Sequence, residues 1–506
     1  MRLSSLSKGL SVFIFFLTPS AFSKPIDIGL RLKEKISIET LAESVLDPQS
    51  PRYQRFYSPD EIRKLAAPSK GEYKKLIRTL RAKGLEIVYA SKSHLFITVR
   101  GEPQLFEQLF STKITFSDSN RILHENTSQA NLGSELNLVE SVVGLDNTRR
   151  SYPHFVPLTA LLTKPNTDPA TIKDIYGFNS IYGAGINGGG QDIAIATYDG
   201  FKIEYIRQYY SKINLNPVPT IEQVKFNGEP NFDELSAVET AVDGEFSGMI
   251  APGAHIRVYA SAHNDDLGEV QIFTAILDDN KAKIANYSWG DCEAHVSAQH
   301  RADMDKVFNR AVAQGVNIFI ASGDTGAAGC QGSSTIAPDW PAAHPSVVAV
   351  GGTTMNISNG QLTETAWSGS GGGVSTFYDL PAWQSGFQAP YTRRSFPDVA
   401  FNADPKTGQD CWVQYQGTLQ WLTIGGTSIA APQWAGFMAL VNQSRGTKGS
   451  LGFLNPLIYG FDSSTRSATF HDVTSGDNKG YNAGVGWDAV TGWGSMKADA
   501  LLKSLQ

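Results

Sequence analysis

The stretch Gly425-Gly426-Thr427-Ser428-Ile429-Ala430-Ala431-Pro432 joins a glycine turn and a hydroxyl pair to a helix-forming run, Gln433 to Ser444. Glycines at such a turn let another backbone approach closely, and the N-terminus of the following helix favours negative charge. These are properties of a serine nucleophile in acyl transfer. A turn or helix cap without a catalytic role gives the same local pattern. The other segments must therefore show whether Ser428 has a base and an oxyanion donor.

Strand-like and helix-like segments alternate from about residue 166 onward. This order predicts a mostly parallel sheet flanked by helices, with sites at the carboxyl ends of its strands. The loops after Ser288 and Ser322 are therefore where chemistry is expected. The predicted strands are Gln191–Tyr198, His255–Ala260, Ile284–Ser288 and Val316–Ser322, and the predicted helices are Glu204–Ile213, Asp233–Met249, Gly268–Asp279 and Ala298–Gln314.

Two carboxylates, Glu239 and Asp243, are spaced four residues apart on one predicted helix, so their side chains are neighbours. They flank an apolar stripe formed by Leu235, Val238, Val242, Phe246 and Met249. Two partly buried acids so placed would tend to share a proton. The functional interpretation is a general base, Glu239, oriented by Asp243. The alternative is a solvated acidic face, because Glu234 and Glu245 lie nearby.

A third carboxyl, Asp324, lies in the glycine turn Ser322-Gly323-Asp324-Thr325-Gly326 at the end of a predicted strand. In its protonated form it could donate a hydrogen bond to a developing oxyanion. The alternative is an aspartate that only caps its own turn. None of the histidines lies in a subtilisin-type His-Gly-Thr helix start, and no His-Glu-x-x-His motif suggests a zinc peptidase.

Composition and the N-terminus indicate an exported globular protein. The chain has 506 residues, a net charge of −6 and a pI of about 5.9, which give no case for nucleic acid binding. Residues 1–23 have the charged, apolar and small-residue regions of a signal peptide, with an N-terminal membrane anchor as the alternative. We expect an α+β segment at 24–146, a linker at 147–165 and a catalytic domain at 166–506.

Together the motifs resemble the sedolisin family of serine-carboxyl peptidases. They stand in the family's order as Glu239-Thr-Ala-Val-Asp243, Ser322 to Gly326 and Gly425 to Pro432. The resemblance implies a subtilisin-like fold and peptide-bond hydrolysis in proteins. It implies Ser428 as nucleophile, Glu239 as general base, Asp243 as its orienting partner, and Asp324 with the Ser428 N–H as oxyanion donors. A carboxyl base stays unprotonated at a lower pH than a histidine base does, so we expect an acidic optimum.

The same resemblance extends to the N-terminal half through Leu46 to Tyr53 and Val143 to Asp146. It implies that residues 24–146 are a ferredoxin-like activation prodomain and that the chain is a zymogen that cleaves itself within the linker. The partners implied are peptide substrates and the chain's own prodomain, and we expect a monomer. Secretion is expected, with medium and periplasm both open.

The glycine-rich segment 470–488 matches the family's calcium loop. The resemblance assigns one structural Ca²⁺ to Asp472, Val473, Gly484, Gly486 and Asp488, in keeping with calcium's preference for oxygen ligands. By composition alone an acidic surface loop is the alternative.

Three cysteines allow one disulfide in an exported protein. We expect Cys292 to pair with Cys330 and leave Cys411 over; free thiols are the alternative. A second class of function, a catalytically silent relative that binds peptides, would lack one of the four catalytic side chains. Endopeptidase action and tripeptide release from N-termini both remain open.

Overall fold

The structure is a computed structural model that describes residues 24–117, 123–157, 167–330, 332–386 and 391–506. The predicted signal peptide at 1–23 and the second half of the predicted linker, 158–165, lie outside the described residues. Within these ranges no helix is both long enough and apolar enough to cross a membrane.

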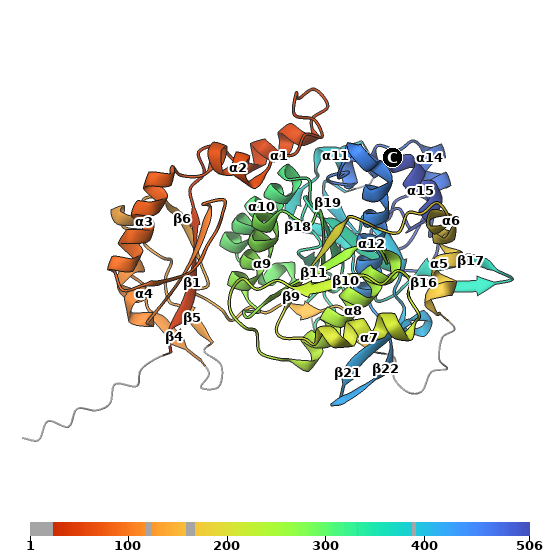
Figure 1. The fold of residues 1–506 in the computed structure, drawn as a ribbon, viewed down its shortest axis with the longest axis horizontal. Coiled ribbons are helices and arrows are strands. Elements are labelled where there is room, and N and C mark those ends of the chain that lie inside the picture. Colours follow the sequence, from red (N-terminus) through yellow and green to blue (C-terminus); the bar gives the residue numbers. More distant parts are fainter. Residues whose placement is uncertain (1–23, 118–122, 158–166, 331, 387–390) are drawn as a thin grey trace, which may run out of the picture.

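The N-terminal part is a four-stranded antiparallel sheet in the order β2-β3-β1-β6 (Figure 1). Its strands are β1 (Ile26–Leu32), β2 (Glu86–Ala90), β3 (Phe96–Gly101) and β6 (Val139–Val143), and helices α3 (Lys70–Ala82) and α4 (Pro103–Phe110) cover its outer face. This β-α-β-β-α-β order is the ferredoxin-like arrangement that the sequence predicts.

Two further helices connect this sheet to the larger domain. Helix α1 (Ile38–Leu46) packs along α10 (Ala298–Ala313), and α2 (Pro59–Ala66) follows it. Helix α2 starts with a capping box, in which Ser58 and Glu61 satisfy each other's backbone N–H groups. The N-terminal domain thus rests on the larger domain through its helices as well as its sheet.

The larger domain is built on a mostly parallel sheet in the order β10-β11-β9-β12-β14-β16-β17, with β20 beside β16. Only β17 runs antiparallel. The strands are β9 (Asp192–Tyr198), β10 (Thr220–Gln223), β11 (His255–Ser261), β12 (Ile284–Tyr287), β14 (Asn317–Ala321), β16 (Val348–Ser358), β17 (Gln361–Ala366) and β20 (Val399–Asn402). The predicted parallel sheet is confirmed.

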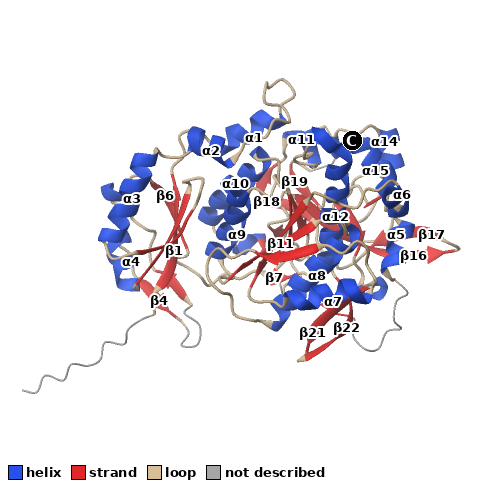
Figure 2. Cartoon of the chain, in the orientation of Figure 1, coloured by secondary structure: helices blue, strands red, loops and turns tan. Residues whose placement is uncertain are grey.

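Helices cover both faces of this sheet (Figure 2). On β9, Ile193 and Ile195 pack toward α7 (Ile203–Lys212), α8 (Glu234–Ile250) and α12 (Thr427–Arg445), while Ala194 and Ala196 face α9 (Asp266–Asp279) and α10. Helices α8 and α12 touch at Gly436, where any side chain would overlap Ile250. This close contact brings the start of α12 against the middle of α8.

Smaller elements complete the chain. The structure gives β4 (Ile114–Phe116), β5 (His124–Asn126), β7 (Tyr152–Pro153), β8 (Val156–Pro157), α5 (Pro169–Ile175), α6 (Phe178–Gly183), β13 (Trp289–Cys292), β15 (Asp339–Trp340), β18 (Gly373–Asp379), α11 (Ala382–Ser385), β19 (Arg393–Phe396), β21 (Gln409–Tyr415), β22 (Thr418–Gly425), α13 (Asn455–Tyr459), α14 (Ser463–Thr469), β23 (Phe470–His471), β24 (Ser495–Met496) and α15 (Ala498–Leu505).

One detail of the predicted helix 233–249 is wrong. Leu235 does not belong to the buried stripe, because it lies in the first turn of α8 and is 52% exposed. The alternative of a solvated acidic face is excluded, because Glu239, Asp243 and Glu245 are all fully buried where α12 and β21, as well as the sheet, cover α8.

Candidate active site

Helices α8 and α12 bring a serine hydroxyl and a carboxylate into contact. Ser428, the second residue of α12, donates its Oγ–H to Glu239 Oε2 at 2.8 Å. Both side chains are fully buried. A serine hydrogen-bonded to a carboxylate is a nucleophile with its base already in place. Glu239 and Ser428, which lie 189 positions apart in the sequence, are therefore in direct contact.

Asp243 lies one helical turn from Glu239 and is held by a strand end. Ser288 Oγ donates to Asp243 Oδ1 at 2.6 Å, and Asn286 Nδ2 donates to Ser288 Oγ at 3.1 Å. The sequence pattern points to this strand but not to the Ser288 hydroxyl. In the described part of the chain, Glu239 Oε1 and Asp243 Oδ2 are buried without a hydrogen-bond partner.

The two unpartnered oxygens indicate that the pair carries a proton. Burial raises the pKa of both carboxyls, and the charge of Asp243 raises that of Glu239 further. Two buried carboxylates side by side cannot both stay ionised cheaply, so a proton between them satisfies both oxygens.

Asp324 approaches the same point from the end of β14. Its Oδ1 accepts the Thr427 N–H at 2.7 Å and the Thr427 hydroxyl at 3.0 Å. Its Oδ2 is buried and has no partner among the described groups. Burial raises the pKa of Asp324 to about 8, although the bonds from Thr427 oppose this. The carboxyl is therefore protonated in acid, with Oδ2 as the atom free to donate.

The segment Tyr152–Pro157 runs through this site as an extended strand. Its first half, β7, pairs antiparallel with β13, and its second half, β8, pairs with β22. Between them the His154 N–H donates to the Ser288 carbonyl at 3.1 Å, and the Ser428 N–H donates to the His154 carbonyl at 2.9 Å. This part of the predicted linker therefore passes between β13 and β22 with the His154 carbonyl against Ser428, although Tyr152 stays exposed.

Gly426 explains how the carbonyl fits. Any side chain at Gly426 would overlap both Asp324 Oδ2 and the His154 carbonyl oxygen. The two oxygens therefore border the same small space, with the Ser428 N–H beside it. A carbonyl placed here has a backbone donor, a protonated carboxyl and a serine hydroxyl around it, which is the arrangement that acyl transfer needs.

The His154 side chain fills a polar pocket beside the site. Its Nδ1 lies 3.3 Å from the Ala321 carbonyl and its Nε2 3.5 Å from Asp339 Oδ2. Burial lowers the pKa of His154 to about 4, while burial and the nearby Asp291 raise the pKa of Asp339. Near neutral pH His154 is thus uncharged, and burial shifts Asp339 toward its protonated form.

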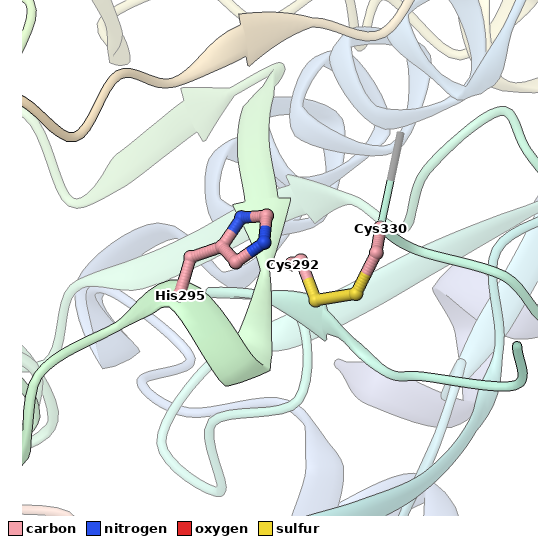
Figure 3. Close-up of side chains that lie close together, drawn as sticks. All are labelled: Cys292, His295 and Cys330. Carbon is pink, nitrogen blue, oxygen red and sulfur yellow. A yellow bond between two sulfur atoms is a disulfide. The ribbon is translucent and has the colours of Figure 1, made fainter. Parts of the chain in front are cut away.

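Among the described residues, two clusters of possible metal ligands lie outside this site. Side chains in both clusters already bond to other groups. Cys292, His295 and Cys330 are close together, but Cys292 and Cys330 form the expected disulfide, so their thiolates are not available (Figure 3). Cys411 is the remaining, buried thiol. The second cluster, Asp266, Glu269 and His300, holds the guanidinium of Arg149.

The predicted calcium ligands lie in one loop whose donors fit the ion. Asp472 Oδ2 accepts the Gly486 N–H at 2.9 Å and Asp488 Oδ2 accepts the Gly484 N–H at 3.1 Å. Among the described residues neither carboxylate has a cationic partner, and no backbone hydrogen bond ends on the carbonyls of Val473, Gly484 or Gly486. Two unpaired carboxylates and three free carbonyls suit a hard cation.

Comparison with known proteins gives a consistent family. The profile of the pro-kumamolisin activation domain matches residues 18–148, and that of the subtilase family matches residues 234–487. Sedolisin of Pseudomonas sp. (strain 101) is 30% identical over 521 residues, covering 95% of this chain and 87% of its own. Kumamolisin of Bacillus sp. (strain MN-32) is 33% identical over 405 residues, covering 73% of this chain and 70% of its own.

A mammalian relative and a solved structure extend the comparison. Tripeptidyl-peptidase 1 of Canis lupus familiaris is 25% identical over 95% of this chain and 91% of its own. The structure of Pseudomonas sedolisin, a serine-carboxyl proteinase complexed with two molecules of pseudo-iodotyrostatin, superposes with a TM-score of 0.61 at 32% identity. It covers 67% of this chain and 98% of that chain.

The buried carboxyls predict that the fold is more stable in acid than at pH 8. Burial is the main cause that raises the pKa of Glu239, Asp243, Glu245, Asp324, Asp339 and Glu364. The folded chain therefore keeps protons that the unfolded chain releases above about pH 4, and stability falls as pH rises. For Asp324, with a pKa of about 8, the free energy of unfolding changes by on the order of 4 kcal/mol between pH 5 and pH 8.

Urea unfolding of the full chain carrying Ser428→Ala, at pH 5 and pH 8, measures this effect. Adding Asp324→Asn, which keeps the shape but cannot ionise, should reduce the difference between the two pH values. Equal or greater stability at pH 8 in the Ser428→Ala chain would contradict the expectation.

Proposed function

This chain belongs to the sedolisin family of serine-carboxyl peptidases, and we propose that it is an exported enzyme of that family that hydrolyses peptide bonds of proteins in acid. The observation that carries the proposal is the 2.8 Å hydrogen bond from Ser428 Oγ to the buried carboxylate of Glu239. Export is supported by the signal-like residues 1–23 and by the disulfide between Cys292 and Cys330.

In the proposed mechanism Ser428 Oγ attacks the substrate carbonyl carbon and Glu239 takes the hydroxyl proton. The negative charge on the tetrahedral oxygen is stabilised by the Ser428 N–H and the Asp324 Oδ2–H. Glu239 then gives its proton to the leaving amine, and the acyl-enzyme is hydrolysed by a water that Glu239 activates in the same way.

Asp243 positions Glu239 and carries the spare proton of the pair. Glu239 must be ionised to act as a base, so the proton that the pair retains belongs on Asp243 in the resting enzyme. The hydrogen bond from Ser288 occupies Asp243 Oδ1, and the buried Oδ2, which has no other partner among the described residues, would carry this proton. The working state therefore has one proton on the pair and one on Asp324.

The activation domain makes the chain a zymogen, and we propose that it cleaves itself between His154 and Phe155. Support comes from the His154 carbonyl, which accepts the Ser428 N–H at 2.9 Å, and from the strand pairings on both sides of that bond. The position lies within the predicted linker at 147–165, between the proposed activation domain at 24–146 and the proposed peptidase domain at 166–506. The monomeric state remains a prediction from the family.

Acid would release the activation domain by protonating carboxylates at its interface. Asp27 bonds to His263 at 3.2 Å, and Glu140 pairs with Lys306 at 3.2 Å. Burial opposes the change, but His263 and Arg100 beside Asp27, and Arg31 and Lys306 beside Glu140, hold the pKa of both carboxyls below its usual range. Of these cations, His263 and Lys306 lie across the interface. Their contribution to docking is therefore present above about pH 4 and is lost as pH falls through the lowered pKa values.

One structural Ca²⁺ is proposed for the loop 470–488. Asp472 and Asp488 would supply carboxylate oxygens and Val473, Gly484 and Gly486 backbone carbonyls. The ion would tie residues on the two sides of the loop together and would supply no step of the reaction. This part of the chain contacts the end of the sheet through Trp487, whose indole N–H donates to the Pro397 carbonyl.

Asp324→Asn should shift the pH profile of the mature enzyme. In the wild type, kcat/KM should fall on the alkaline side as Asp324, with a pKa of about 8, loses its proton. An asparagine keeps an acceptor for Thr427 and an N–H donor that does not titrate, so the alkaline limb should move to higher pH. The measurement is kcat/KM on a denatured protein substrate from pH 3 to pH 9.

Comparison variants separate the roles. Asp324→Ala, which removes the donor, should lower kcat by about 10² to 10³-fold. Ser428→Ala and Glu239→Gln should abolish cleavage. A Ser428→Ala protein with wild-type activity, or an activity confined to alkaline pH, would show that the carboxyl-base assignment is wrong; inactivity of the wild type would favour a peptide-binding relative.

Self-processing should produce a mature chain whose N-terminus is Phe155. Purified precursor is brought to pH 4, and N-terminal sequencing of the product identifies the first bond cut. The Ser428→Ala precursor should remain intact under the same conditions. A first cut elsewhere would reject the His154–Phe155 assignment, and cleavage of pure Ser428→Ala precursor would reject self-processing.

Calcium removal should lower the thermal stability of the mature enzyme. Incubation with a calcium-selective chelator should reduce Tm by several degrees, and added Ca²⁺ should restore it. In Asp488→Asn one carboxylate ligand is lost, so Tm should change less with the Ca²⁺ concentration than it does in the wild type. A Tm that does not respond to chelator or Ca²⁺ would argue against the ion.

A further inference from the structure

Arg149 is buried in a pocket of the larger domain, away from the attacked bond. Its side chain is only 10% exposed. Arg149 Nε lies 2.5 Å from Asp266 Oδ1, and Nη2 lies 2.6 Å from Glu269 Oε2. His300 Nε2 also lies 2.7 Å from Glu269 Oε2. Two different nitrogens of one guanidinium thus contact two carboxylates on the first turn of α9.

The backbone between this pocket and the attacked carbonyl is held along its length. The Asn264 side-chain amide accepts the Ser151 N–H at 3.0 Å and donates to the Ser151 carbonyl at 3.1 Å. Tyr152 and Pro153 then pair with β13. These contacts go to the backbone, so other sequences can make most of them. Arg149 is the sixth residue on the amino side of the bond after His154, counting His154 as the first.

Glu269 requires a cation in this pocket. It is fully buried, and besides Arg149 and His300 its contact is the Trp340 indole N–H, 3.3 Å from Oε1. Burial would raise the pKa of Glu269, but the charge of Arg149 and the bond to His300 lower it to about 2. When Arg149 departs with the activation domain, this carboxylate loses its main counter-charge.

The pocket is reachable from outside once the activation domain has gone. It borders a cavity of about 670 Å³ between the two domains, whose walls include Asp266, His300 and Asp303 from the larger domain. Strand β6 and the residues that follow it form the opposite wall. Removal of that wall opens the pocket to solvent and to an incoming polypeptide.

We propose that Asp266, Glu269 and His300 form a substrate subsite of the mature peptidase that takes an arginine side chain at the sixth position on the amino side of the cleaved bond. The inference rests on the proposed function, and it makes the enzyme an endopeptidase that binds an extended internal stretch of its substrate. Arginine suits the pocket better than lysine, because only a guanidinium presents separate nitrogens to two carboxylates.

Three N-acetylated peptides test the subsite with the mature enzyme at pH 4. One has the sequence of residues 148–157, and the others carry alanine or lysine in place of Arg149. All three should be cut after the histidine despite the blocked N-terminus. The arginine peptide should have a kcat/KM about tenfold higher than the alanine peptide, with lysine between them, as a buried charged hydrogen bond predicts.

Pocket variants show where the preference originates. In Glu269→Gln the ratio between arginine and alanine peptides should fall to about one. Asp266→Asn, at the more exposed rim, should reduce it partly and serves if Glu269→Gln does not fold. The ratio is the readout because a general structural defect lowers both rates together. Equal rates for the arginine and alanine peptides, or for arginine and lysine, would overturn the proposal.

Affinities separate this proposal from the proposed function. Fluorescence anisotropy of the labelled peptides measures binding whether or not cleavage occurs. If no peptide is cut but the arginine peptide binds about tenfold more tightly, the subsite stands and the catalytic assignment fails. If all peptides are cut at the same rate with the same affinity, the catalytic assignment stands and the subsite fails.

Discussion

Burial of Glu239 and Asp243 one helical turn apart is the constraint on which the site depends. Neither side chain reaches water, and their own repulsion keeps a proton on the pair. Such a pair is tolerable only where hydrogen bonds hold the remaining oxygens. The end of β12 supplies Ser288 for Asp243, and α12 supplies Ser428 for Glu239. The sheet and the close contact of α8 with α12 at Gly436 are what align these donors.

The two domains respond to pH in opposite directions. In the larger domain, buried carboxyls without cationic partners have raised pKa values, so they favour the folded state in acid. At the interface, Asp27 and Glu140 are paired with cations and have lowered pKa values, so they favour docking near neutral pH. Protonation of the buried carboxyls favours the folded peptidase domain, whereas protonation of Asp27 and Glu140 weakens the docking of the activation domain. Under the proposed activation, acid would therefore separate the activation domain from the peptidase domain without unfolding the peptidase domain.

Local patterns predict much of this molecule, and long-range contacts account for what they miss. The capping box at Ser58, the strand–helix alternation and the four-residue spacing of Glu239 and Asp243 are written within single segments. The burial of Glu245 is not, because it depends on β21, which lies far along the chain and crosses over α8. The path of residues 152–157 past Ser428 likewise depends on β13 and β22, which lie more than a hundred residues away in the sequence.

Prediction of the catalytic site from the sequence has a similar limit. The spacing and motif order identify Glu239, Asp243, Asp324 and Ser428 as candidates. In the structure Ser428 contacts Glu239, and Asp324 Oδ2 and the Ser428 N–H border one carbonyl. The partners that hold them, Ser288 and Thr427, have no distinctive spacing, because a hydroxyl that supports a carboxylate looks like any other serine or threonine in sequence. The sequence has two adjacent arginines, Arg149 and Arg150, but nothing in it indicates the pocket that receives Arg149.

The strand at Tyr152–Pro157 also bears on the timing of activation. In each molecule the His154–Phe155 bond lies beside the Ser428 that would cut it, so this step needs no encounter with a second molecule. Its rate is then first order, and the half-time is the same in a dilute medium as in a concentrated one. Molecules exported at different concentrations would therefore be activated over the same time once the pH falls. The timing would depend on acidity and not on the protein concentration.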